Sequence, residues 1–135
     1  MRMSFISLLF LTNLLFPMET NNKETETEFY DVTDVVATTY TPSVKETDST
    51  PLITASGFKI NPKNPKRHRI IAVSRDLKKK YKFGTRVKVS GAGKYSGEYV
   101  VRDVMNKRYR KRIDILIGHK DKQTKFKNVK IRKVS

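Results

Sequence analysis

The segment YVVRDVMNKRYRKRIDILIG, residues 99–118, contains two short apolar runs, and each run carries one aspartate. Asp103 ends the first run and Asp114 lies inside the second. Runs of valine and isoleucine predict β-strands. Because a basic loop of about eight residues joins them, the two strands can be neighbours that bring both carboxylates to one end of a sheet. A carboxylate in an apolar strand costs free energy unless it is paired or functional.

Short β-type runs separated by turn residues continue on both sides of this segment. Alternating or β-branched residues predict further strands at 34–42, 70–73, 86–91 and 129–134, and the polar stretch 119–128 is predicted to be helical. About six short strands with little helix indicate a small β-barrel or sandwich. The strands carry many lysines and need paired edges, which favours the closed barrel.

Composition excludes several kinds of chemistry. The 135-residue chain has no cysteine, so disulfides, a cysteine nucleophile and a thiolate zinc site are excluded. Its two histidines, His68 and His119, are too few for a three-histidine metal site. Any hydrolytic chemistry must therefore use carboxylates or hydroxyls.

The charge of the chain is strongly asymmetric. Residues 1–57 hold three basic and eight acidic side chains, whereas residues 58–135 hold 26 basic and five acidic ones. A positive field of this size attracts polyanions, including cell-wall polymers, lipopolysaccharide and nucleic acid. A cationic surface that only keeps the protein soluble is the alternative interpretation.

The N-terminus resembles an export signal. Arg2 precedes an apolar run from Phe5 to Phe16, which is too short to span a bilayer comfortably but has the length of a signal-peptide core. The acidic, aperiodic stretch behind it is typical of a spacer. We predict a signal peptide over residues 1–20, a disordered spacer over 21–31 and a barrel domain over 32–135. The mature chain would then be exported to the periplasm, the cell envelope or the medium, without a transmembrane span.

The two aspartates are the candidate catalytic groups. Paired carboxylates raise the pKa of one of them, because two like charges do not ionise easily at short range. A carboxyl group that stays protonated near neutral pH can act as the general acid in glycosidic cleavage. Ion pairing is the alternative, since Arg102, Arg110 and Arg112 are close in sequence and would lower that pKa instead.

Six motifs in order resemble the three-aspartate domain family, which is related to the barrel of membrane-bound lytic transglycosylase A and to rare lipoprotein A. They are VVATTYTP (35–42), TASGFKI (54–60), IIAVSRDL (70–77), FGTRVKV (83–89), VVRDVMN (100–106) and RIDIL (112–116). The resemblance covers residues 32–134. It implies an all-β fold, a small six-stranded double-psi β-barrel, and an association with peptidoglycan cleavage.

The resemblance also assigns site residues. It places the family's second and third aspartates at Asp103 and Asp114. Ser74 stands where the first is usual, and the nearest carboxylate is Asp76, so either residue can take that place. Val104, Met105 and Asn106 replace the usual Thr-Gly-Gly. The resemblance also implies that four residues line the substrate site: Thr38, Tyr40, Ser56 and Lys59.

The implied activity is cleavage of the bond between N-acetylmuramic acid and N-acetylglucosamine by aspartate acid/base catalysis. This mechanism needs neither metal nor cofactor, so the resemblance implies that the protein has none. Peptidoglycan strands are the expected partner, with anionic wall or outer-membrane polymers as further partners, and the protein is expected to be a monomer. A glycan-binding barrel without activity is the first alternative. The second is a nucleic-acid-binding barrel with Tyr81, Tyr95 and Tyr109 as stacking platforms, although export argues against nucleic acid as a partner.

Overall fold

The computed structural model describes residues 31–43 and 52–135. The predicted signal peptide and nearly all of the predicted spacer lie outside these residues. Residues 32–135 belong to one compact unit. Its strands are β1 (Thr33–Tyr40), β2 (Ile70–Val73), β3 (Arg86–Ser90), β4 (Gly97–Val104), β5 (Arg112–Leu116) and β6 (Lys125–Lys133). Three short 3-10 helices complete it: η2 (Pro65–His68), η3 (Arg75–Leu77) and η4 (Gly93–Tyr95).

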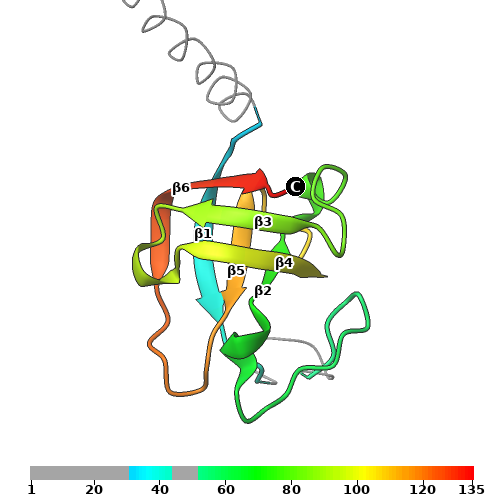
Figure 1. Cartoon of the computed structure of the whole chain (residues 1–135), viewed down its shortest axis with the longest axis vertical. Coiled ribbons are helices and arrows are strands. Elements are labelled where there is room, and N and C mark those ends of the chain that lie inside the picture. The colour runs from blue at the N-terminus through cyan, green and yellow to red at the C-terminus, as the bar shows by residue number, and fades with distance from the viewer. Residues whose placement is uncertain (1–30, 44–51) are drawn as a thin grey trace, which may run out of the picture. The chain divides into compact units, whose positions relative to one another are not determined.

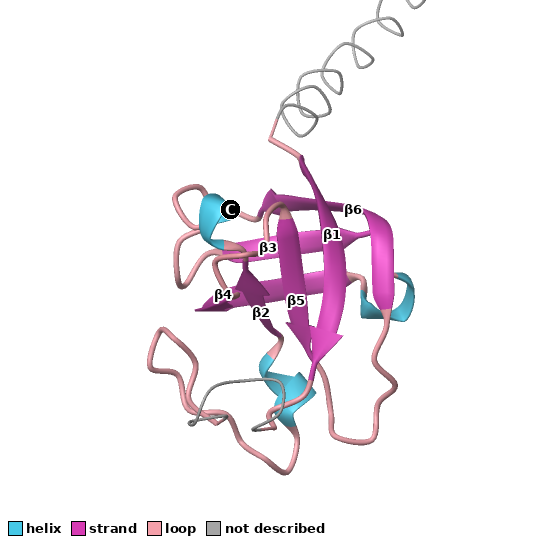
Figure 2. Ribbon diagram, turned by 180° about the vertical axis from the view of Figure 1, so that it is seen from behind, coloured by secondary structure: helices cyan, strands magenta, loops and turns pink. Residues whose placement is uncertain are grey.

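The six strands close into a barrel in the order β1-β5-β2-β4-β3-β6. Two of the pairs, β1 with β5 and β2 with β4, are parallel, and the other four are antiparallel. Figure 2 shows β1 and β5 side by side, with β3 and β4 crossing behind them. The predicted all-β class and six-stranded barrel are confirmed, and the non-sequential parallel pairs fit a double-psi barrel.

The barrel interior is filled by one side of each strand. In β5, for example, Ile113 and Ile115 point inward and are at most 1% exposed, so Arg112, Asp114 and Leu116 lie on the outer face. The inward residues are mostly β-branched, which suits a pleated, closely packed surface. Those contributed by the strands are Val35, Ala37, Ile71, Val73, Val87, Val89, Tyr99, Val101, Ile113, Ile115, Val129 and Ile131.

A second apolar cluster lies outside the barrel wall. It consists of Tyr40, Ile60, Ile70, Ala72, Met105 and Leu116, with Leu52, Phe58 and Tyr109 packed against it. Residues 52–69 supply part of this cluster, and they form a long excursion near the ends of β1 and β5 (Figure 1). The outer face of β1, β5 and β2 is therefore covered at this end instead of being fully solvated.

The helix predicted over 119–128 is wrong. The chain runs without regular structure after β5, and β6 already begins at Lys125. Val129 and Ile131 are buried in the barrel, while Phe126 packs against the same core. The many polar residues of β6 conceal its alternation of buried and exposed positions. Only the face that points into the barrel needs to be apolar.

Candidate functional site

Asp103 and Asp114 lie at the same level on opposite sides of Ala72. Ala72 of β2 pairs with Asp103 of β4 on one side and with Asp114 of β5 on the other. Asp114 in turn pairs with Thr38 of β1. These four residues, which we call the carboxylate row, cross the outer face of the barrel. Ala72 places only a methyl group between the two acids.

A β-bulge aims Asp103 at this row. The pairing of β2 with β4 shifts between Ile71 and Ala72, so that Arg102 becomes an extra residue in β4. Strict alternation after the inward-pointing Val101 would send the Asp103 side chain into the barrel, whereas the bulge turns it outward. Bulges of this kind commonly redirect a side chain next to a functional site.

Main-chain donors hold the Asp103 carboxylate in place. Its Oδ1 accepts hydrogen bonds from the N–H of Ala55 at 2.9 Å and from the N–H of Val104 at 3.0 Å. The β-turn Thr54–Gly57 carries Ala55 to this position, and Gly57 completes that turn with a φ of 85°. Two N–H donors stabilise a negative charge on Asp103.

The two predicted lining residues of β1 each contact one of the two acids. The Thr38 hydroxyl donates to Asp114 Oδ1 at 3.0 Å, and the Tyr40 hydroxyl lies 3.5 Å from Asp103 Oδ2. Burial, followed by the charges of Asp103 and Asp114, raises the pKa of Tyr40 well above its usual value near 10. Tyr40 therefore stays protonated and able to donate throughout the neutral range.

Ser56 and Lys59 take different places. The Ser56 N–H donates to the carbonyl of Arg102 at 3.1 Å, and its hydroxyl is 2.9 Å from the Thr54 hydroxyl, so Ser56 fixes the turn next to Asp103. Lys59 is exposed, and its backbone pairs with that of Ile53 in an isolated antiparallel β-bridge that flanks the Thr54–Gly57 turn.

Asp76 and Ser74, the two candidates for the first aspartate, lie outside the carboxylate row. Asp76 is exposed in η3, and its Oδ2 accepts the N–H of Lys111 at 3.0 Å. Ser74 is fully buried, and its hydroxyl accepts the N–H of Arg112 at 3.0 Å. Slight burial raises the pKa of Asp76, but hydrogen bonds from Ser74, Lys111 and its own N–H, with the charge of Arg110, lower it overall. Both side chains hold the loop that enters β5.

The three nearby arginines have identifiable positions. The Arg102 guanidinium lies 5.2 Å from the centre of the Phe58 ring, and that of Arg112 lies 4.8 Å from the centre of the Tyr109 ring. The positive charge of Arg110 helps to lower the pKa of Asp76. Both rings pack against the outer apolar cluster, which also contains Ala72, so Arg102 and Arg112 lie over aromatic rings on the face that carries the carboxylate row.

The proposed tyrosine platforms for nucleic acid are wrong for two of the three residues. Tyr81 is fully buried and its hydroxyl is 2.6 Å from that of Thr33, while Tyr95 is only 8% exposed. Both rings belong to the barrel core, because burying a large apolar ring is favourable even where basic residues are adjacent in the sequence. Tyr109 is the one that remains partly exposed.

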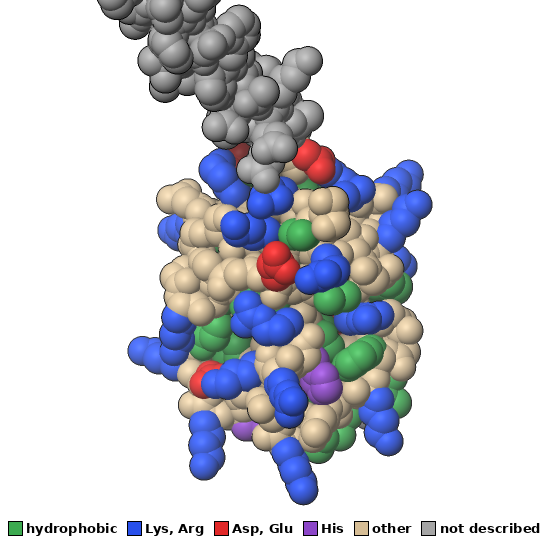
Figure 3. Space-filling view, viewed as in Figure 1, with side chains coloured by type: hydrophobic (Ala, Val, Ile, Leu, Met, Phe, Trp, Pro, Cys, Tyr) green, Lys and Arg blue, Asp and Glu red, His purple; other side chains and the backbone are tan. Residues whose placement is uncertain are grey.

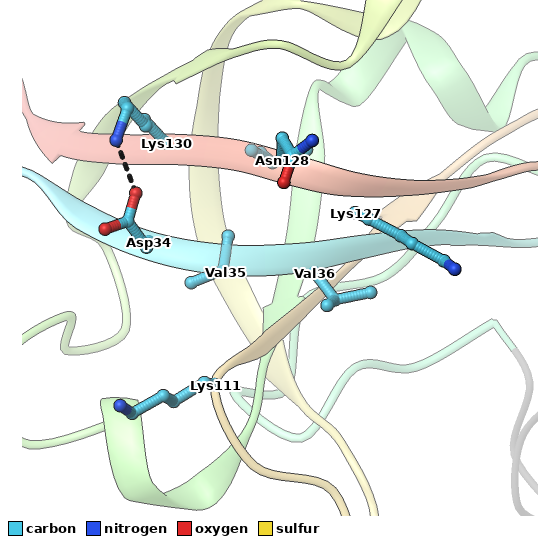
Figure 4. A pocket seen from close by; sticks show the side chains of 8 residues that line it. Asp34, Val35, Val36, Lys111, Lys127, Asn128 and Lys130 are labelled. Carbon is cyan, nitrogen blue, oxygen red and sulfur yellow. Dashed lines mark hydrogen bonds and ion pairs between the residues drawn. The ribbon is translucent and has the colours of Figure 1, made fainter.

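Basic side chains are spread over the surface shown in Figure 3, with few acidic ones among them. A separate groove of about 500 Å³ lies between β1 and β6, where their pairing shifts. In Figure 4, Lys130 reaches Asp34 across the strands at 2.5 Å, whereas Lys111 and Lys127 extend in opposite directions. The positive charges that line this groove are therefore either paired with Asp34 or directed away from each other. It is lined by Asp34, Val35, Val36, Lys111, Lys127, Asn128, Val129 and Lys130.

Within the described residues, no three His, Cys, Asp or Glu side chains gather in a way that would hold a metal ion. Over the same two ranges, 31–43 and 52–135, no helix is long and apolar enough to cross a membrane.

Comparisons with known proteins add the following. No protein-family model matches the chain, and no curated protein matches its sequence. One similar solved structure is an aspartate-to-asparagine mutant of Clavibacter michiganensis expansin in complex with cellohexaose, with 17% identity and a TM-score of 0.46. The alignment covers 77% of this chain and 50% of that one, so the chain spans half the length of the expansin structure.

The sequence did not reveal the groups that position the aspartates. The N–H groups of Ala55 and Val104 belong to the main chain, so no residue type in the sequence reveals that they bind Asp103. The Thr-Ala-Ser-Gly motif drew attention only to the turn that contains Ala55. Phe58 and Tyr109 were readable as aromatic residues next to basic ones, but their packing beside the carboxylate row depends on the excursion and the loop that bring them there.

Proposed function

We propose that this barrel cleaves a glycosidic bond of peptidoglycan, with Asp103 and Asp114 as its two catalytic carboxylates. The observation that carries the proposal is the placement of the two carboxylates on either side of Ala72. Two inter-strand spacings separate their backbones by roughly 10 Å. Their side chains can approach to the separation of several ångströms that carboxylate pairs use in glycoside cleavage. The resemblance to the three-aspartate family supports the same substrate.

The hydrogen bonds divide the roles between the two acids. Asp103 receives two main-chain N–H bonds, which suit a fixed carboxylate that stabilises positive charge developing at the sugar C1. Asp114 contacts the Thr38 hydroxyl, which can donate to a carboxylate or accept from a carboxylic acid. Asp114 is therefore our candidate for the general acid, because its partner accommodates both protonation states.

The reaction balances without water. Asp114 donates its proton to the glycosidic oxygen while the bond from that oxygen to C1 breaks. The C6 hydroxyl oxygen then closes on C1 and returns its proton to the Asp114 carboxylate. The products are a 1,6-anhydro sugar end and a free hydroxyl on the leaving sugar.

A non-catalytic glycan-binding barrel is the second candidate. It is favoured by Ser74 and Asp76, which both hold the loop before β5 instead of contributing a third carboxylate to the row. Mass spectrometry of purified peptidoglycan after incubation with the protein separates the two functions. Anhydro-muropeptides that disappear with Asp114→Asn support cleavage, whereas binding to sacculi without these products supports the second candidate.

A further inference from the structure

The loop between β4 and β5 is strongly basic and firmly anchored. Residues 105–111 contain four basic and no acidic side chains. Three consecutive residues, Ser74 to Asp76, hold it: the Ser74 hydroxyl accepts the N–H of Arg112, Arg75 Nε donates to the carbonyl of Met105 at 3.3 Å, and Asp76 accepts the N–H of Lys111. Lys111 has a φ of 47°, a strained value for a residue with a side chain.

Tyr109 gathers two guanidinium groups, one from this loop and one from the first residue of β5. Those of Arg108 and Arg112 each lie 4.8 Å from the centre of its ring, and Arg108 Nη2 donates to the Tyr109 hydroxyl at 2.7 Å. Tyr109 itself packs against the outer apolar cluster.

This group lies next to the carboxylate row. Arg112 and Asp114 are two residues apart on the outer face of β5, which corresponds to about 7 Å along the strand. A polymer that places one linkage at Asp114 would therefore place a neighbouring sugar unit, or its substituent, beside Arg112.

We propose that Arg108 and Arg112, held together by Tyr109, form a binding subsite for a carboxylate carried by the glycan next to the linkage at Asp114. The inference rests on the proposed function and adds a substrate class, a carboxylate-bearing glycan as opposed to a neutral one. Tyr109 is a positioning residue in this subsite.

The chemistry of the group favours an anion. Two positive charges beside one ring repel each other, and a bound carboxylate would offset that repulsion. Guanidinium groups bind carboxylates through paired N–H donors, and the aromatic ring keeps their planes in place. Phosphate shares this chemistry, so the test must separate the two anions.

The experiment measures binding of the full chain by calorimetry, with Asp114→Asn as the common background so that no cleavage occurs. The probes are glycan strands with intact carboxylates, the same strands after amidation, and neutral chitohexaose. We expect Arg108→Gln and Arg112→Gln each to weaken binding of the intact strands about tenfold, the usual effect of losing one charged hydrogen-bonding group. Binding of the other two probes should change less than about twofold.

The control is Arg86→Gln, which removes the same charge from β3, on the opposite side of the barrel. It should change no affinity by more than about twofold, because a distant exposed charge is screened by salt. If Arg112→Gln loses the native circular dichroism spectrum, Arg108→Gln decides the question, since Arg108 is exposed in the loop.

Three results would overturn the inference: equal affinity for intact and amidated strands, equal loss for all three probes, or displacement of the intact strands by inorganic phosphate at concentrations where acetate has no effect. Failure of the proposed function looks different. Wild-type protein that prefers intact strands but yields no anhydro-muropeptides contradicts cleavage and leaves the subsite standing. Anhydro products without the carboxylate preference contradict only the subsite.

Discussion

The carboxylate of Asp76 accepts the main-chain N–H of Lys111 at 3.0 Å, which ties the turn after β2 to the residue that enters β5. This bond holds the backbone of Lys111 in its left-handed conformation. Asp76 thereby fixes the end of the loop that carries Arg108 and Tyr109.

Replacing Asp76 by Ala should loosen this loop. We expect amide hydrogen exchange at Lys111 to accelerate several-fold, because its acceptor is lost. The matched control is Asp121→Ala, which removes a similar bond to the N–H of Gly118 at 2.9 Å and should leave Lys111 unchanged. Unchanged exchange at Lys111 in Asp76→Ala would contradict the anchoring role.

The same bond should depend on pH in a defined direction. The pKa of Asp76 is lowered from 3.8 in the folded protein, so its carboxylate stabilises the fold above that pH, and this contribution is lost as the pH falls through the lowered value. Exchange measured at pH 6 and near pH 3, corrected for the intrinsic rate, should show lower protection of Lys111 in acid. The protection at Lys111 in Asp76→Ala should not follow this change.

The carboxylates should be needed for cleavage but not for folding. Asp103→Asn and Asp114→Asn should each lower turnover roughly a hundredfold or more. Asn keeps the size of the side chain, but at position 114 it cannot exchange a proton, and at position 103 it lacks the negative charge that stabilises C1. Asp76→Asn should have a smaller effect. Release of anhydro-muropeptides is the readout, and thermal unfolding shows whether each variant folds.

Two results would contradict these assignments. Folded variants that cleave at the wild-type rate would show that neither acid is catalytic. Loss of the folded state in both variants would show instead that the aspartates are structural, as the ion-pairing alternative requires.

Two glycines with similar φ angles, Gly91 and Gly84, should respond differently to substitution. Gly91 has a φ of 86°, and a Cβ there would lie 2.4 Å from the carbonyl oxygen of Asn128 in β6, which cannot move without breaking the barrel. Gly84 has a φ of 90° with nothing within 4 Å of such a Cβ. We expect Gly84→Ala to cost about 1–2 kcal/mol of unfolding free energy and Gly91→Ala at least about 3 kcal/mol. Urea unfolding measures both, and equal losses would contradict the close approach of Asn128.

Salt should weaken retention on the cell wall. The 26 basic and five acidic side chains of residues 58–135 attract anionic polymers mainly through screened charge. Pull-down on purified sacculi across a salt series should show falling retention. Retention that stays constant from low to high salt would indicate that uncharged contacts dominate.

Export remains a prediction from the apolar run Phe5–Phe16. Fractionation of cells that express a C-terminally tagged chain should recover a shortened protein outside the cytoplasm. A full-length cytoplasmic product that retains Met1 would contradict it.

The sequence alone determined the strands and the two acids. Alternation in β3, continuous apolar residues in β2 and the apolar run around Asp114 predicted strands where the structure has them. These patterns are readable because burial of alternate side chains is a local property of the strand. The sequence could equally single out Asp103 and Asp114, because a carboxylate next to valine and isoleucine stands out from its neighbours.

Only the tertiary structure decided which way Asp103 points and what Asp76 does. By alternation, Asp103 should follow Tyr99 and Val101 into the barrel, and the bulge that turns it outward exists only in the pairing of β4 with β2. Asp76 is separated from Lys111 by 35 residues, and their contact follows from the position of β2 next to β5. Strand register and long-range hydrogen bonds arise when distant segments pair, so no local pattern of residues specifies them.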